Sequence, residues 1–135
     1  QTEQKNMSTN AANAPSLTAV LQSLHELKVM LVCDHEGVVL LRAGDEVFEP
    51  ALQRMAVVFA QTTEQANKLG LGRNKYVVAF HESSVFVNVS LSPLVLTLMA
   101  DAGANLGLLL DALPRLCSAL EPMQHSFENF TNAHQ

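Results

Sequence analysis

Histidine and cysteine are the residue types in this chain best suited to metal binding or nucleophilic chemistry. The five histidines are His25, His35, His81, His125 and His134, and the two cysteines are Cys33 and Cys117. Zinc sites usually draw ligands from short spacings such as CxxC or HExxH, and neither occurs here. Cys33 and His35 would share one strand face, but Cys33 ends an apolar run, where a thiol usually serves as inert packing. The pattern therefore predicts no metal site and no catalytic residue.

Two glycine-containing segments invite comparison with phosphate-binding loops. The first, from Gly70 to Lys75 (GLGRNK), follows an expected helix, whereas phosphates bind where a loop enters a helix N-terminus. The second, from Asp101 to Gly107, does enter an expected helix, but it lacks the full GxGxxG pattern and the acidic residue downstream. We interpret it as a loop in which Asn105 caps the helix, and we expect no cofactor at either segment.

The length and amino-acid composition exclude several classes of protein. A chain of 135 residues has room for one cored domain, and 48% hydrophobic against 16% charged residues predicts that it folds. The net charge of −5 argues against a general binder of nucleic acid or of anionic membranes. The polar residues 1–15 have no apolar core of a signal peptide, and no stretch reaches the length of a membrane span. We expect a flexible N-terminal lead over 1–15, no direct membrane insertion, and reduced thiols.

Hydrophobic periodicity predicts the elements that position these residues. Helical spacing indicates three helices, which lie at 16–27 behind Ser16 as the cap, at about 47–69, and from 106 to about 123 with an interruption at Pro114. Apolar runs indicate five strands, at 29–33, 38–41, 76–80, 85–91 and 94–100. The first two strands are joined by a short hairpin loop, and the links among the last three are too short for crossovers, so the last three must pair antiparallel.

The predicted fold is therefore of the α/β class (α+β), in the order αββαβββα. The strands are mostly continuous in apolar residues, which is typical of a sheet covered on both faces. We expect a five-stranded antiparallel sheet with the second helix on one face and the first and third helices on the other. The domain should span 16–123, followed by a C-terminal tail over 124–135.

The second helix carries more apolar surface than one sheet-facing stripe requires. The stripe consists of Phe48, Leu52, Met55 and Phe59, and the flanks add Ala51 and Val58 on one side and Ala56 and Ala60 on the other. Large exposed apolar patches are rare in monomers, so the pattern favours a second buried surface beside the sheet. The alternative is that alanine and valine are simply tolerated at the edge of the helix.

The predicted order αββαβββα is accompanied by four distinctive runs of residues, at 34–38, 68–75 (KLGLGRNK), 91–95 and 104–108. With these runs the chain resembles the roadblock family, and within it the roadblock-domain scaffold subunits of the Ragulator complex, which partner the kinase MEK. The likeness covers 16–123 and is strongest over 66–108. The N-terminal lead is longer than is usual in the family, and Pro114 stands in a helix that should be uninterrupted.

The resemblance implies a noncatalytic adaptor that needs no cofactor. Roadblock proteins pair through the second helix and the third strand, so that two five-stranded sheets join edge to edge. The residues of this chain that fall on such an interface are Ala51, Met55, Val58, Thr62, Gln65, Tyr76, Val78 and Phe80. An unpaired strand at 76–80 would be an exposed edge that invites aggregation, which agrees with this expectation.

The implied partners are the second roadblock subunit of Ragulator, its lipidated anchor subunit, Rag GTPases, and the kinases MEK and ERK. The chain would then work at the cytoplasmic face of late endosomes and lysosomes, held there by its partners, in amino-acid signalling to the mTOR complex. Two alternatives stay open. One is a homodimeric roadblock protein such as a dynein light chain or a small-GTPase regulator, and the other is a small-molecule sensor or enzyme with a polar pocket.

Overall fold

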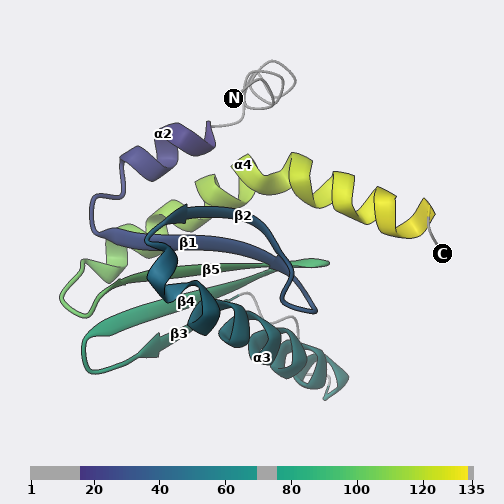
Figure 1. The fold of residues 1–135 in the computed structure, drawn as a ribbon, viewed down its shortest axis with the longest axis horizontal. Coiled ribbons are helices and arrows are strands. Elements are labelled where there is room, and N and C mark those ends of the chain that lie inside the picture. Colours follow the sequence, from purple (N-terminus) through teal and green to yellow (C-terminus); the bar gives the residue numbers. More distant parts are fainter. Residues whose placement is uncertain (1–15, 70–75, 134–135) are drawn as a thin grey trace. The chain divides into compact units, whose positions relative to one another are not determined.

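A computed structural model describes residues 16–69 and 76–133 (Figure 1). These residues form two compact units, one spanning Glu26–Ala104 and the other combining the residues up to His25 with those from Asn105 onward. The predicted lead over 1–15, the glycine-containing segment from Gly70 to Lys75 and His134 lie outside the described residues. Each unit is described by itself.

The larger unit is built on a five-stranded antiparallel sheet, as predicted. Its strands are β1 (Leu27–Asp34), β2 (Val39–Gly44), β3 (Tyr76–Phe80), β4 (Ser84–Leu91) and β5 (Leu94–Asp101). They lie in the order β2-β1-β5-β4-β3. The three central strands β1, β5 and β4 therefore have partners on both sides, whereas β2 and β3 are the edges.

The turn between β1 and β2 follows from its polar sequence. The Asp34 carboxylate accepts hydrogen bonds at 2.9 Å from the backbone N–H groups of Glu36 and Val38, which closes the loop on itself. Gly37 takes φ = 90°, a left-handed conformation that glycine adopts readily because it has no Cβ atom. Gly44 ends β2 at φ = 106°, where a Cβ atom would lie 2.1 Å from the carbonyl oxygen of Lys28.

Helix α3 (Glu49–Lys68) packs on one face of the sheet behind a 3-10 turn, η1 (Glu46–Phe48). The 3-10 turn is capped by Asp45, whose side chain accepts a hydrogen bond from the Val47 N–H at 3.0 Å. The core between helix and sheet is formed by Leu52, Ala56 and Phe59 of α3 with Val29, Leu31, Cys33, Val95 and Met99. Ala56 is fully buried, so this residue of the second flank belongs to the core, whereas Ala60 is only partly buried.

An ion pair ties β2 to the first turn of α3. The Arg42 guanidinium contacts both carboxylate oxygens of Glu49, with Nε to Oε1 at 2.7 Å and a second contact at 3.2 Å. The Arg42 side chain is 54% exposed, so solvent screens the pair and its net contribution to stability is small. The two-pronged geometry mainly fixes how α3 starts over the sheet.

The two faces of the sheet differ in chemistry. On the α3 face, β4 presents Phe86, Asn88 and Ser90, since these pair with the β5 residues that join the helix core. The buried Thr97 hydroxyl donates to the Asn88 side-chain oxygen at 2.9 Å, which satisfies two polar groups in this layer. The alternate residues of the central strands are apolar and buried, namely Met30, Val32, Val85, Val87, Leu94, Leu96 and Leu98.

The smaller unit contains helices α2 (Leu17–Gln22) and α4 (Leu106–Ala133), which contact one another. The prediction of a first helix over 16–27 was too long. The Ser23 hydroxyl donates to the Val20 carbonyl at 2.6 Å and the helix ends there, while Leu27 opens β1. Ser16 occupies the cap position, but its side chain makes no capping hydrogen bond.

Helix α4 begins as predicted and continues further than predicted. The Asn105 side chain accepts a hydrogen bond from the Leu108 N–H at 3.2 Å, which confirms it as the cap. The helix then runs through Pro114 and Pro122 to Ala133, so Pro114 does not end it and the tail predicted from 124 is largely helical. A proline removes one backbone donor, yet the helix continues past Pro114, with Leu113 and Leu116 buried before and after it. Among the described residues no helix has the length and hydropathy that a membrane span requires.

Candidate interaction groove

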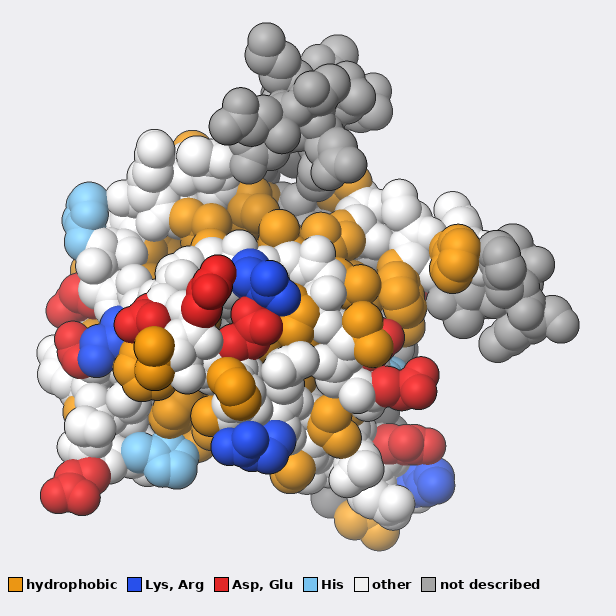
Figure 2. All heavy atoms as spheres, in the orientation of Figure 1, with side chains coloured by type: hydrophobic (Ala, Val, Ile, Leu, Met, Phe, Trp, Pro, Cys, Tyr) orange, Lys and Arg blue, Asp and Glu red, His pale blue; other side chains and the backbone are white. Residues whose placement is uncertain are grey.

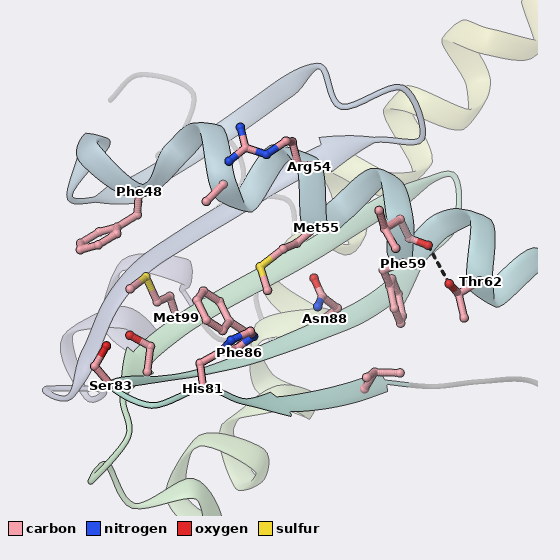
Figure 3. Close-up of a pocket in the computed structure, with 14 residues that line it drawn as sticks. Phe48, Arg54, Met55, Phe59, Thr62, His81, Ser83, Phe86, Asn88 and Met99 are labelled. Carbon is pink, nitrogen blue, oxygen red and sulfur yellow. Dashed lines mark hydrogen bonds between the residues drawn. The ribbon is translucent and has the colours of Figure 1, made fainter.

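Helix α3 leaves one side of the sheet uncovered. It lies over β1, β5 and β4, and the edge strand β3 extends beyond it. A groove of about 680 Å³ opens there, between α3 and the part of the sheet formed by β3 and β4 (Figure 3). In the view of Figure 1, hydrophobic side chains also reach the surface between charged ones (Figure 2).

The helix wall of the groove contains most of the interface residues predicted on the second helix. Ala51, Met55, Val58 and Thr62 all line it. Val58 is 59% exposed although it is a large apolar residue, whereas Met55 is half-buried. The Thr62 hydroxyl donates to the Val58 carbonyl at 2.9 Å, so this hydroxyl is satisfied within the helix (Figure 3). Gln65 is exposed one turn further along α3 and does not line the groove.

The floor and the strand wall come from residues that the sequence analysis did not select. Phe86, Asn88 and Met99 lie beneath the side chains that project from α3 (Figure 3). On β3 the groove residue is Val77, which pairs with Asn88 and therefore shares its face of the sheet. The sequence could not reveal this choice, because both alternating sets of residues in β3 are mainly apolar.

The three β3 residues predicted for the interface lie on the other face of the sheet. Tyr76, Val78 and Phe80 pair with Val89, Val87 and Val85, the set that points away from α3. Tyr76 is 43% exposed and Phe80 is 67% exposed, so both aromatic rings are open to solvent. The structure thus brings four of the predicted residues together in the groove and places these three along the same edge strand.

The groove is weakly basic, although the chain as a whole has a net charge of −5. Among the described residues that line it, Arg54 and His81 are the basic ones and none is a carboxylate. The His81 ring meets Phe86 edge to face, with centroids 5.0 Å apart and an interplanar angle of 88°. A wall of apolar side chains with two basic groups suits the burial of another protein's apolar surface.

The residues considered for catalysis or metal binding are not gathered at the groove. Burial raises the pKa of the Cys33 thiol from 9.0 to about 11, with further effects from Asp34 and Glu49, so the thiol is a poor nucleophile at neutral pH. Burial also raises the pKa of Cys117. His25, His35, His81 and His125 are exposed, and within residues 16–69 and 76–133 no group of metal-ligating side chains comes together.

The chain is similar in sequence to proteins of one family. Residues 14–127 match the family model described as mitogen-activated protein kinase kinase 1 interacting. The chain is 32% identical over 110 residues to Ragulator complex protein LAMTOR3-B of Xenopus laevis, and 31% identical over 110 residues to Ragulator complex protein LAMTOR3 of Homo sapiens. Each alignment covers 80% of this chain and 89% of the relative.

Solved structures show the same fold at lower identity. The roadblock/LC7 domain from Streptomyces avermitilis superposes with a TM-score of 0.63 at 17% identity, covering 78% of this chain and 92% of that one. Myxococcus xanthus MglB superposes with a TM-score of 0.65 at 18% identity, covering 82% of this chain and 95% of that one. The element order and sheet described above are therefore those of a roadblock domain.

Proposed function

The chain belongs to the mitogen-activated protein kinase kinase 1 interacting family and is similar to the Ragulator LAMTOR3 proteins, and we propose that it is a noncatalytic adaptor subunit of the Ragulator complex. The likeness to roadblock-domain scaffold subunits predicted from the sequence runs is confirmed. An adaptor works by presenting surfaces to several proteins, so its chemistry should lie in what it buries on binding and not in reactive groups.

The observation that carries this proposal is that an open apolar groove lies beside β3, an edge strand with one side available for a further strand. Val58 on α3 and Val77 on β3 both line the groove, and β3 has a strand partner on one side only. A second roadblock subunit that adds its own edge strand to β3 would continue the sheet. Its equivalent helix would then lie beside α3 and fill the groove. Pairing of this kind removes an aggregation-prone edge and buries apolar surface at the same time.

We assign the interface to both sets of residues named from the sequence. Ala51, Met55, Val58 and Thr62 would meet the partner helix, and Gln65 would extend that contact along α3. Tyr76, Val78 and Phe80 would meet the partner across the strand boundary, on the opposite face of the continued sheet. Val77 joins the first set, because its register places it in the groove.

The remaining roles rest on family membership. As a Ragulator subunit, the dimer would be held at the cytoplasmic face of late endosomes and lysosomes by the lipidated anchor subunit. There it would support recruitment of Rag GTPases, amino-acid signalling to the mTOR complex, and docking of MEK and ERK.

Purification of the tagged chain from cells, followed by mass spectrometry of the bound proteins, tests the proposal. We expect the second roadblock subunit in equal amount with the chain, together with the lipidated anchor subunit. A chain isolated as a stable homodimer, with no other roadblock subunit bound, would instead favour a homodimeric roadblock protein and would refute the Ragulator assignment.

A further inference from the structure

A second cavity lies on the other flank of α3 from the groove and has a different chemistry. It encloses about 270 Å³ and is lined from the β1–β2 turn, α3, β4 and β5. Its polar lining residues are His35, Thr63, Glu64, Ser90 and Ser92, and its apolar ones include Phe59 and Val95. A single water occupies about 30 Å³ of liquid, so the space exceeds what one bridging water would fill.

Thr63 is the most unusual residue of this cavity. It is only 7% exposed, and its hydroxyl is buried without a hydrogen-bond partner. The neighbouring Thr62 makes a hydrogen bond that is common for threonine in a helix, since its hydroxyl donates to the Val58 carbonyl one turn back. A ligand that offers a hydrogen bond from the cavity would therefore satisfy a group that now has no partner.

The charge of the lining selects the ligand. Glu64 supplies a carboxylate, His35 is an exposed imidazole, and none of the described lining residues is lysine or arginine. Among these described lining residues an anion would find no lysine or arginine, whereas a cation would meet the carboxylate and several hydroxyl oxygens. The apolar floor formed by Phe59 and Val95 suits the methylene stem of a long basic side chain.

We propose that this cavity accepts an arginine side chain from a partner protein. The stem would lie against Phe59 and Val95, the guanidinium would pair with Glu64, and a further N–H would donate to the Thr63 hydroxyl. Arginine fits better than lysine, because its planar head carries five donors that can reach a carboxylate and hydroxyl oxygens together. The site lies on the opposite flank of α3 from the groove and does not depend on how the chain dimerises.

The test is a nuclear magnetic resonance titration of the full ¹⁵N-labelled chain, in the complex in which it is purified. The probes are N-acetyl-arginine-N-methylamide, its neutral citrulline counterpart, and agmatine. We expect the blocked arginine to shift the amide signals around His35, Thr63 and Ser90, and citrulline to bind roughly tenfold more weakly. Equal binding of arginine and citrulline, or shifts elsewhere, would overturn the proposal. Agmatine binding much tighter than blocked arginine would point to a free amine and refute a protein source.

Two substitutions in the cavity and one control outside it sharpen the result. Glu64→Gln should weaken binding of the blocked arginine roughly tenfold, while Glu82→Gln, the same change in the exposed turn before β4, should leave it unchanged. Thr63→Val should weaken binding and also raise the melting temperature of the probe-free protein by about 4 °C, since it removes an unpaired buried hydroxyl. Equal effects of the two carboxylate variants would contradict the site, as would a Thr63→Val variant that binds arginine like the parent.

Discussion

Val58 on α3 and Val77 on β3 line the same groove, one from its helix wall and the other from its strand wall. Val58 is 59% exposed and Val77 is 38% exposed, so two β-branched apolar side chains border open space between a helix and an edge strand. Neither side chain is needed to complete the core beneath α3. The two side chains are therefore available to a partner. Substitutions of the groove residue Val58 and of the core residue Leu52 should separate effects on binding from effects on folding.

Substitution of Val58 by aspartate should abolish pairing without unfolding the chain. In the proposed interface the change buries an unpaired carboxylate, at a cost of about 4 kcal/mol, or roughly a thousandfold in affinity. Leu52→Asp is the matched control, because Leu52 is fully buried and its replacement should unfold the chain. Circular dichroism and a pull-down with the second roadblock subunit measure the two effects. A folded Val58→Asp variant that binds like the parent would remove this flank from the interface.

The buried pair of Asn88 and Thr97 should behave as one unit in a double-mutant cycle. Asn88→Val or Thr97→Val alone leaves a buried polar group without its partner, which should lower the free energy of unfolding by about 1–3 kcal/mol. The double variant should cost less than the sum of the two, by about 1 kcal/mol. Urea denaturation gives these values, and strict additivity would show that the 2.9 Å hydrogen bond contributes nothing.

The Cys33 thiol should make stability fall at alkaline pH. Its pKa is about 11 in the folded chain against an ordinary 9.0, so the unfolded chain loses this proton first as the pH rises. The stabilisation is fully present below pH about 9 and is lost progressively towards pH about 11. Urea midpoints across this range should fall more steeply for the parent than for Cys33→Ala, which lacks the thiol. Parallel curves would mean that the thiol titrates alike in both states.

Two glycines with similar backbone angles should respond differently to alanine. Gly44→Ala places a Cβ atom 2.1 Å from the backbone oxygen of Lys28, whereas at Gly37 the nearest atom is the tip of Val57 at 3.0 Å. Gly37→Ala should cost about 1–2 kcal/mol for its positive φ, and Gly44→Ala on the order of 3 kcal/mol or more. Thermal melts of both variants compare them, and equal losses would show that the backbone near Lys28 yields easily.

Much of this architecture could be predicted from the sequence, because its signals are local. The strand at 76–80 was predicted with the bounds of β3, and the Gly37 turn and the Asn105 cap follow from short-range backbone chemistry. The early end of α2 and the passage of α4 through Pro114 were not predictable, since side-chain packing outweighs local propensity there. Likewise, the groove combines Val58, Val77 and Met99, which lie far apart in the sequence and meet only through sheet register.

Hydrogen–deuterium exchange of the chain with and without the second roadblock subunit tests the central claim most directly. The sheet has two edges, β2 (Val39–Gly44) and β3 (Tyr76–Phe80), and only β3 borders the groove. The account predicts that the partner slows exchange of backbone amides in β3 and leaves β2 unchanged, because new ladder hydrogen bonds form at one edge alone. Protection of β2 in place of β3, or no protection of either edge by a partner that does bind, would contradict it.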